Sequence, residues 1–162
     1  KNNMSKNKIE FPDFKLKGKN IKVGVALARW NTEITESLMR GVVQALKDAG
    51  MLSPGKNFAV LDVPGSFELP RAAQKLFKEE KVDVVIALGC LIKGETMHFE
   101  YIADAVSNGL MRVSLDAEKP VVFGVLTCLN EKQAKARATG KNNHGYSWGL
   151  TAIEMALTNK RK

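Results

Sequence analysis

The feature that most constrains the fold of this chain is a set of four short apolar runs, each rich in β-branched residues. Their hydrophobicity is nearly continuous rather than alternating, which is typical of parallel strands that are covered on both faces. The four runs are Ile21–Ala28, Phe58–Val63, Val82–Leu88 and Val121–Thr127. They predict the central sheet of an α/β protein.

Helical patterns alternate with these runs. After the first run, apolar residues recur every three or four positions from Ile34 to Ala49, and Gly50 provides a helix stop. Similar patterns follow the second and third runs, a short charged helix is expected near Glu131–Ala138, and a last helix follows a Gly/Asn-rich stretch. This alternation predicts a doubly wound α/β sandwich, with helices on both faces of a four-stranded parallel sheet. We expect a single domain over residues 21–160.

The formal net charge of +8 belongs to the two ends of the chain. Residues 1–22 hold seven lysines against two acidic residues, and residues 160–162 are all basic, whereas residues 23–159 carry 15 basic and 15 acidic residues. A domain that grips nucleic acid usually carries its positive charge on the folded body, so we do not expect nucleic-acid binding. Residues 1–20 form a basic, polar arm with one candidate strand around Ile9–Phe11.

Membrane and metal-binding classes are not expected either. No apolar run approaches the roughly 20 residues of a membrane span. Cys90 and Cys128 lie in apolar contexts without CxxC spacing or a Cys/His cluster, so neither a disulfide scaffold nor a metal site is predicted. Two reduced thiols indicate a cytoplasmic protein.

Ligands of parallel α/β sheets bind outside the carboxyl ends of the strands, so the turns after the four runs are the candidate site. Trp30 ends the first run, and its ring either packs on a helix or offers a flat face to a planar heterocycle. Asn31 is more simply a helix N-cap than a ligand contact. In the second turn, Ser66 is equally suited to capping a helix, and Glu68 either suits the helix dipole or accepts hydrogen bonds from a polyol.

The third turn, from Gly89 to His98, carries the most information. Two glycines bracket a loop that leads into a long helix, whose first backbone N–H groups lack intrahelical acceptors and form an anion site. His98, in the first turn of that helix, is favoured as a proton acceptor over a purely structural histidine. In the fourth turn, Arg137 is either a solvated helix charge or a bidentate partner for a phosphate.

Three motifs resemble a known enzyme family over nearly the whole chain. They are Val63–Pro70 (VPGSFELP), Gly89–Tyr101 with its core KGETMHFEY, and Phe123–Thr127 (FGVLT). The chain thus resembles the 6,7-dimethyl-8-ribityllumazine synthases, the transferases of the penultimate step of riboflavin biosynthesis. The resemblance implies a flavodoxin-like fold and the condensation of 5-amino-6-(D-ribitylamino)uracil with 3,4-dihydroxy-2-butanone 4-phosphate, which releases phosphate and water without a metal or organic cofactor. A non-catalytic flavin- or pterin-binding module of the same fold is the alternative.

The resemblance also implies a role for each site residue. Those that would bind the pyrimidine and the ribityl chain, the first by stacking, are Trp30, Asn31, Ser66, Phe67, Glu68, Leu91, Ile92 and Phe123. Those that would bind the phosphate are Glu95, Thr96, Arg137 and, as a weaker candidate, Lys141. His98 would shuttle protons.

The family assembles into homopentamers, and in some members twelve pentamers close into a hollow icosahedral shell, a 60-mer. The resemblance implies an active site at the subunit interface, with Phe123 and Arg137 supplied by a neighbour, and an N-terminal arm strand added to a neighbour's sheet. The segment Gly140–Gly149, with His144, and the tryptophan at position 30 resemble the fungal members, which stay pentameric. Trp30 further predicts that riboflavin binds this site more readily than it would bind a phenylalanine variant.

Overall fold

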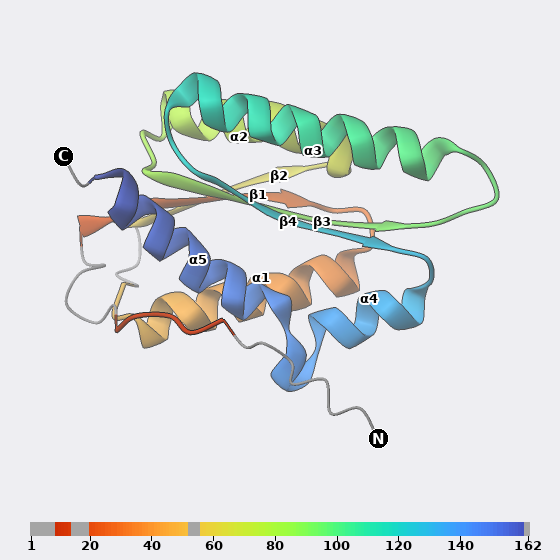
Figure 1. The fold of residues 1–162 in the computed structure, drawn as a ribbon, viewed down its shortest axis with the longest axis horizontal. Helices are drawn as coiled ribbons and strands as arrows, with labels where there is room; N and C mark the ends of the chain where they lie inside the picture. Colours follow the sequence, from red (N-terminus) through yellow and green to blue (C-terminus); the bar gives the residue numbers. More distant parts are fainter. Residues whose placement is uncertain (1–8, 14–19, 52–55, 161–162) are drawn as a thin grey trace.

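The computed structural model describes residues 9–13, 20–51 and 56–160. A four-stranded, all-parallel sheet in the order β2-β1-β3-β4 lies at the centre, and helices cover both of its faces (Figure 1). The strands are β1 (Val23–Ala28), β2 (Phe58–Val63), β3 (Val84–Ile92) and β4 (Val121–Cys128). The predicted three-layer α/β fold is therefore confirmed.

The helices divide between the two faces of the sheet. One layer contains α1 (Thr32–Asp48), α4 (Glu131–Ala138) and α5 (His144–Asn159), and the other contains α2 (Leu69–Glu79) and α3 (His98–Ala117) (Figure 1). Two 3-10 turns, η2 (Ser66–Glu68) and η3 (Gly140–Asn142), precede α2 and α5. None of the helices in the described ranges is both long enough and apolar enough to cross a membrane.

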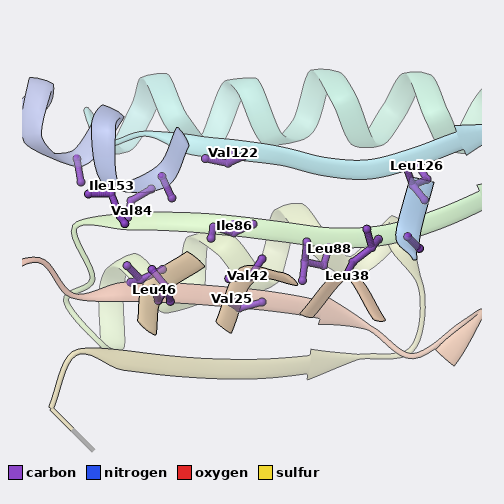
Figure 2. Packing of buried hydrophobic residues seen from close by; sticks show 14 of the residues in the cluster. Val25, Leu38, Val42, Leu46, Val84, Ile86, Leu88, Val122, Leu126 and Ile153 are labelled. Atoms are coloured by element: carbon purple, nitrogen blue, oxygen red, sulfur yellow. The ribbon is translucent and has the colours of Figure 1, made fainter. Parts of the chain in front are cut away.

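The layer of α1 and α5 packs tightly on the sheet. Figure 2 shows Leu38, Val42 and Leu46 of α1 against buried residues of the inner strands, among them Ile86 and Leu88. The helices α1 and α5 touch closely where they cross, because α5 places Gly145 and Gly149 against α1. A Cβ on Gly145 would overlap the carbonyl oxygen of Leu38.

The layer of α2 and α3 has a second apolar core. Ala73 and Leu76 of α2 and Val106 and Leu110 of α3 pack against the opposite side of the sheet. These two residues of α3 are the only ones in this 20-residue helix that are buried. A large part of α3 therefore faces away from the chain's own core.

The strands differ from the sequence prediction mainly in their ends. The first and third strands begin two residues later than expected, at Val23 and Val84. The third continues through Cys90–Ile92 instead of ending at Leu88, because these residues pair with Leu126–Cys128 of β4.

Two further expectations need correction. The Gly/Asn-rich stretch ends at Asn143, because α5 begins at His144, so the residues from His144 to Gly149 are helical and not a loop. The side chain of Asn143 caps this helix by accepting a hydrogen bond from the N–H of Gly145. Residues 9–13 form no strand within the chain, although Phe11 packs against the α1–α5 core. The remainder of the predicted arm, apart from Asn20, lies outside the described residues.

Candidate active site

A cavity of about 520 Å³ opens at the carboxyl ends of β1, β2 and β3, where the sequence predicted the site. Its walls are formed by η2, the end of β3 and the first turns of α3. The structure brings together around it the predicted site residues Trp30, Asn31, Ser66, Phe67, Glu68, Leu91, Ile92, Thr96 and His98. The cavity wall therefore combines aromatic, amide, hydroxyl, carboxylate and imidazole groups.

The end of β1 supplies Trp30 and Asn31. The Trp30 side chain is 73% exposed, so its ring is not packed beneath a helix and is available for stacking. Asn31 adopts a left-handed conformation with φ 61° at the N-cap position of α1. Its side chain does not cap the helix, contrary to the simpler sequence interpretation. Instead, its Nδ2 donates to the carbonyl oxygen of Cys90 at 2.9 Å and ties the ends of β1 and β3 together.

The end of β2 supplies the motif that contains Ser66 and Glu68. Ser66 is buried and does not cap η2 with its side chain; it lies so close to Gly89 that a Cβ there would overlap its hydroxyl. The Oε2 of Glu68 accepts a hydrogen bond from the N–H of Gly65 at 3.0 Å. Only one carboxylate oxygen of Glu68 is thus engaged by the described residues, which leaves the other for a ligand hydroxyl.

The turn between β3 and α3, residues 94–97, forms the far wall. Within the described part of the chain, the backbone N–H groups of Glu95, Thr96 and Met97 have no hydrogen-bond acceptor. The N–H of His98 donates to the Thr96 hydroxyl at 3.3 Å, and the His98 side chain borders the cavity. Free N–H groups at a helix start suit an anion, as predicted.

Three predicted site residues lie away from this cavity: Phe123, Arg137 and Lys141. Glu95 is not among the lining residues, but it lies in the turn between Gly94 and Thr96, which both line the cavity. Arg137 is exposed on α4, in the opposite helical layer, where its Nη1 donates to the carbonyl oxygen of Gln133 at 3.0 Å. Phe123 is 40% exposed on the edge strand β4, and Lys141 is exposed in η3. Among the described residues, no lysine or arginine lines the cavity.

Several side chains of the wall were not singled out from the sequence. Phe99 and Ile102 belong to the apolar pattern that follows the third run, and they border the cavity. The two residues lie three positions apart in the first turns of a helix that begins at a strand tip, so both lie on the same side of that helix. This spacing is the signal that could have identified them. Cys90 also contributes to the wall. Burial, and to a lesser extent the nearby Cys128 thiol, raise the pKa of the Cys90 thiol to about 12, so it is protonated and not a nucleophile.

His144 lies at the start of α5 and meets Trp148 edge-on, with ring centroids 5.7 Å apart. Burial lowers the pKa of His144, and the charge of nearby Arg137 lowers it further. The same guanidinium opposes the rise that burial causes in the pKa of Cys128. In the described ranges, no group of three or more His, Cys, Asp or Glu side chains is arranged to hold a metal ion.

Comparison with known proteins extends across all of these elements. The family model described as 6,7-dimethyl-8-ribityllumazine synthase matches residues 20–160. The chain is 45% identical to the 6,7-dimethyl-8-ribityllumazine synthase of Schizosaccharomyces pombe, over 88% of this chain and 90% of that protein. It is 42% identical to the enzyme of Pyricularia oryzae, over 86% of this chain and 88% of that protein. It is 48% identical to the bacterial enzyme of Cytophaga hutchinsonii, over 82% of each chain.

Proposed function

This chain belongs to the 6,7-dimethyl-8-ribityllumazine synthase family, and on that premise we propose how its residues carry out the family's reaction. The enzyme condenses 5-amino-6-(D-ribitylamino)uracil with 3,4-dihydroxy-2-butanone 4-phosphate and releases phosphate and water, as a transferase of riboflavin biosynthesis. The observation that carries the residue assignment is the cavity at the carboxyl ends of the strands. A non-catalytic binding module is not favoured, because the relatives are named as synthases.

The pyrimidine binds at the tips of β1 and β3. The exposed Trp30 ring stacks on the planar heterocycle, and the exposed Phe67 also borders the cavity. The backbone groups of Leu91 and Ile92 read the edge of the ring. The ribityl chain then lies toward η2, where the free oxygen of Glu68 accepts hydrogen bonds from its hydroxyls.

Asn31 and Ser66 hold the same part of the substrate. One N–H of Asn31 Nδ2 donates to the Cys90 carbonyl oxygen, which leaves the second N–H to donate to the substrate and Oδ1 to accept from it. Ser66 is 4% exposed, so only a small part of its side chain reaches the cavity.

The phosphate binds at the start of α3. The backbone N–H groups of Glu95 and Thr96, which have no acceptor among the described residues, indicate this position, because a helix start favours negative charge. In the reaction, the substrate amine forms a bond to the ketone carbon and water leaves. Elimination then breaks the carbon–oxygen bond to phosphate as a carbon proton is removed. His98, which borders the cavity beside this turn, accepts and returns protons.

The cation for the phosphate comes from a second copy of the chain. Arg137 and Phe123 lie outside their own cavity, and the described cavity wall has no lysine or arginine of its own. We assign both residues, with Lys141 as a weaker candidate, to a neighbouring subunit's site. Support for such a neighbour comes from three apolar residues that α3 leaves mostly exposed, Tyr101, Met111 and Leu115.

We propose a cytoplasmic homopentamer in which residues 21–160 act as one domain and the basic arm adds a strand to a neighbour's sheet. The two free cysteines, Cys90 and Cys128, support a reducing compartment. Residues 9–13, the described part of the arm before Asn20, form no strand within their own chain, which supports strand formation with a neighbour.

The enzymatic assignment is tested by mixing both substrates with the protein and following the lumazine product optically. Relative to wild type, His98→Ala should lose about tenfold or less, because much of the acceleration comes from holding two reactive substrates together. A wild-type rate no greater than the spontaneous condensation would contradict the assignment. An unchanged rate in His98→Ala would contradict only the role of that histidine.

The shared site is tested by co-assembling Arg137→Ala chains with Trp30→Ala/His98→Ala chains. Some sites in the mixture then combine an intact cavity with an intact Arg137 from the other chain. The mixture should therefore be more active than the weighted mean of its two components. Activity equal to that mean would place Arg137 in its own chain's site.

A further inference from the structure

One ion pair fastens the two sides of the turn at residues 94–97. Lys93 directly follows β3, and Glu100 lies in the first turn of α3. The Lys93 ammonium binds Oε1 of the Glu100 carboxylate. Within the described residues, no other ion pair joins the end of β3 to the start of α3.

Little else fixes the path of this turn. Its residues are exposed, and a Cβ built on Gly94 would meet no atom within 4 Å. The N–H of Lys93 donates to the carbonyl oxygen of Cys128 at 2.9 Å, which holds the first end of the turn against β4. At the second end, the N–H of His98 donates to the Thr96 hydroxyl at 3.3 Å, and the N–H of Tyr101 donates to the carbonyl oxygen of Met97, also at 3.3 Å.

The Glu100 carboxylate depends on Lys93. Although the Glu100 side chain is 40% exposed, its Oε2 is covered and has no hydrogen-bond partner in the described structure. Ion pairs between fully exposed groups contribute little, but a carboxylate with one covered oxygen is costly to leave without its cation. The Lys93 ammonium also lies 5.9 Å from the ring centre of Phe99, a residue of the cavity wall.

We propose that Lys93 and Glu100 are positioning residues whose ion pair sets the path of residues 94–97 and so aims the N–H groups of Glu95 and Thr96 at the substrate phosphate. This inference rests on the proposed function, which assigns the phosphate to that turn. Neither member of the pair lines the cavity, so both act through the backbone of the turn. Displacing reacting groups by less than an ångström is enough to cost catalysis, so a loosened turn weakens phosphate binding without touching the pyrimidine site.

The test compares Glu100→Gln, Lys93→Met and Lys93→Arg with wild type. Glu79→Gln, which removes the exposed Lys75–Glu79 pair on α2, is the matched control. The measurements are kcat, the KM of each substrate, and the inhibition constant of inorganic phosphate. The chain's fold is checked in each variant by circular dichroism.

Glu100→Gln should raise both the KM of the butanone phosphate and the inhibition constant of phosphate, by roughly tenfold. The KM of the pyrimidine should stay within about twofold. Lys93→Met should have at least as large an effect, because it leaves the carboxylate unpartnered. Lys93→Arg keeps the charge and should recover most of the loss, and Glu79→Gln should match wild type.

Equal changes in both KM values, or none, would overturn the proposal, as would a Lys93→Arg variant as impaired as Lys93→Met. Failure of the phosphate assignment itself would look different. Inorganic phosphate would then fail to compete with the butanone phosphate in the wild-type enzyme, which overturns both proposals. Competition with an unchanged inhibition constant in Glu100→Gln overturns the role of the ion pair alone.

Discussion

The two helical layers differ in how completely the chain covers them. Helix α1 buries eight of its 17 residues. Helix α3 buries only Val106 and Leu110 of its 20 residues. Its residues Tyr101, Met111 and Leu115 are 73%, 60% and 66% exposed. We call the layer of α1, α4 and α5 the complete layer, because the chain itself buries much of α1. We call the layer of α2 and α3 the open layer, because α3 has an apolar face that the chain leaves exposed.

The site is divided in the same way. The cavity is walled by η2 and the start of α3, in the open layer, and Arg137 lies on α4 in the complete layer (Figure 1). In the proposed assembly, the cavity and the Arg137 that we assign to the phosphate come from different chains. We therefore expect the site to be completed when the chains assemble. Variants in the two layers should impair different properties of the protein.

The largest effect is expected where the complete layer is tightest. Gly145→Ala places a methyl group against the Leu38 carbonyl oxygen and must force α5 away from α1. We expect it to lower the free energy of unfolding by about 3 kcal/mol, measured by urea denaturation. Gly94→Ala is the control, since its methyl group meets open space, and it should change stability by about 0.5 kcal/mol or less. Equal stability of the two variants would contradict the tight crossing.

A polar substitution in the open layer should weaken the assembly and leave the stability of the folded chain nearly unchanged. Leu115→Ser removes an exposed apolar side chain from α3, so the folded chain loses little. If that side chain is buried between subunits, each interface loses about 2 kcal/mol. Sedimentation velocity should then show smaller species at low concentration. An unchanged sedimentation profile would mean that Leu115 is not covered in the assembly.

A smaller effect is expected for the substitution of Arg137, which lies in one helical layer while the cavity is walled mainly by the other. Arg137→Ala removes the charge-assisted contact to the phosphate and should raise the KM of the butanone phosphate by roughly tenfold or more. The KM of the pyrimidine should change less. Lys132→Ala, on the same exposed helix, is the control for a general loss of positive charge. Equal effects of the two variants would contradict a specific role for Arg137.

The smallest effect concerns pH and the complete layer. Burial, and then the charge of Arg137, lower the pKa of His144 in the folded chain. The unfolded chain takes up this proton near pH 6.5, so between the two pKa values it binds more protons than the folded chain. Stability should therefore fall as the pH drops below about 6.5. Urea denaturation at several pH values should show a weaker fall in His144→Gln, and an identical fall would contradict the expectation.

Local patterns in the sequence predicted which helices and strands form, because a strand buried on both faces leaves a continuous apolar run and a helix buried on one face leaves a periodic one. The ends of elements depended on distant partners. Cys90–Ile92 continue β3 because β4 lies beside them. Asn143 ends the Gly/Asn-rich stretch because it caps α5 and also donates to the carbonyl oxygen of Ser37, in α1. No local pattern contains these contacts.

The same limit applies to the site. Trp30, Ser66 and His98 could be predicted because the carboxyl ends of parallel strands converge on one edge of the sheet. The hydrogen bond from Asn31 to Cys90 joins two strands across 59 positions, so the sequence favoured a helix cap instead. Arg137 carries no local sign of the role we propose for it, because such a role depends on how separate chains pack and not on neighbouring residues in the sequence.

The crossing of α1 and α5 also dictates the timing of folding on the ribosome. A nascent chain that has emerged only as far as α4 carries an α1 whose contact surface for Gly145 and Gly149 has nothing to cover it. This surface of α1 therefore stays uncovered until α5 has formed. Contacts between segments that are distant in the sequence form slowly, which prolongs the exposure of apolar surface. A chain that stops before His144 should accumulate as aggregate and as a client of chaperones, not as a shortened enzyme.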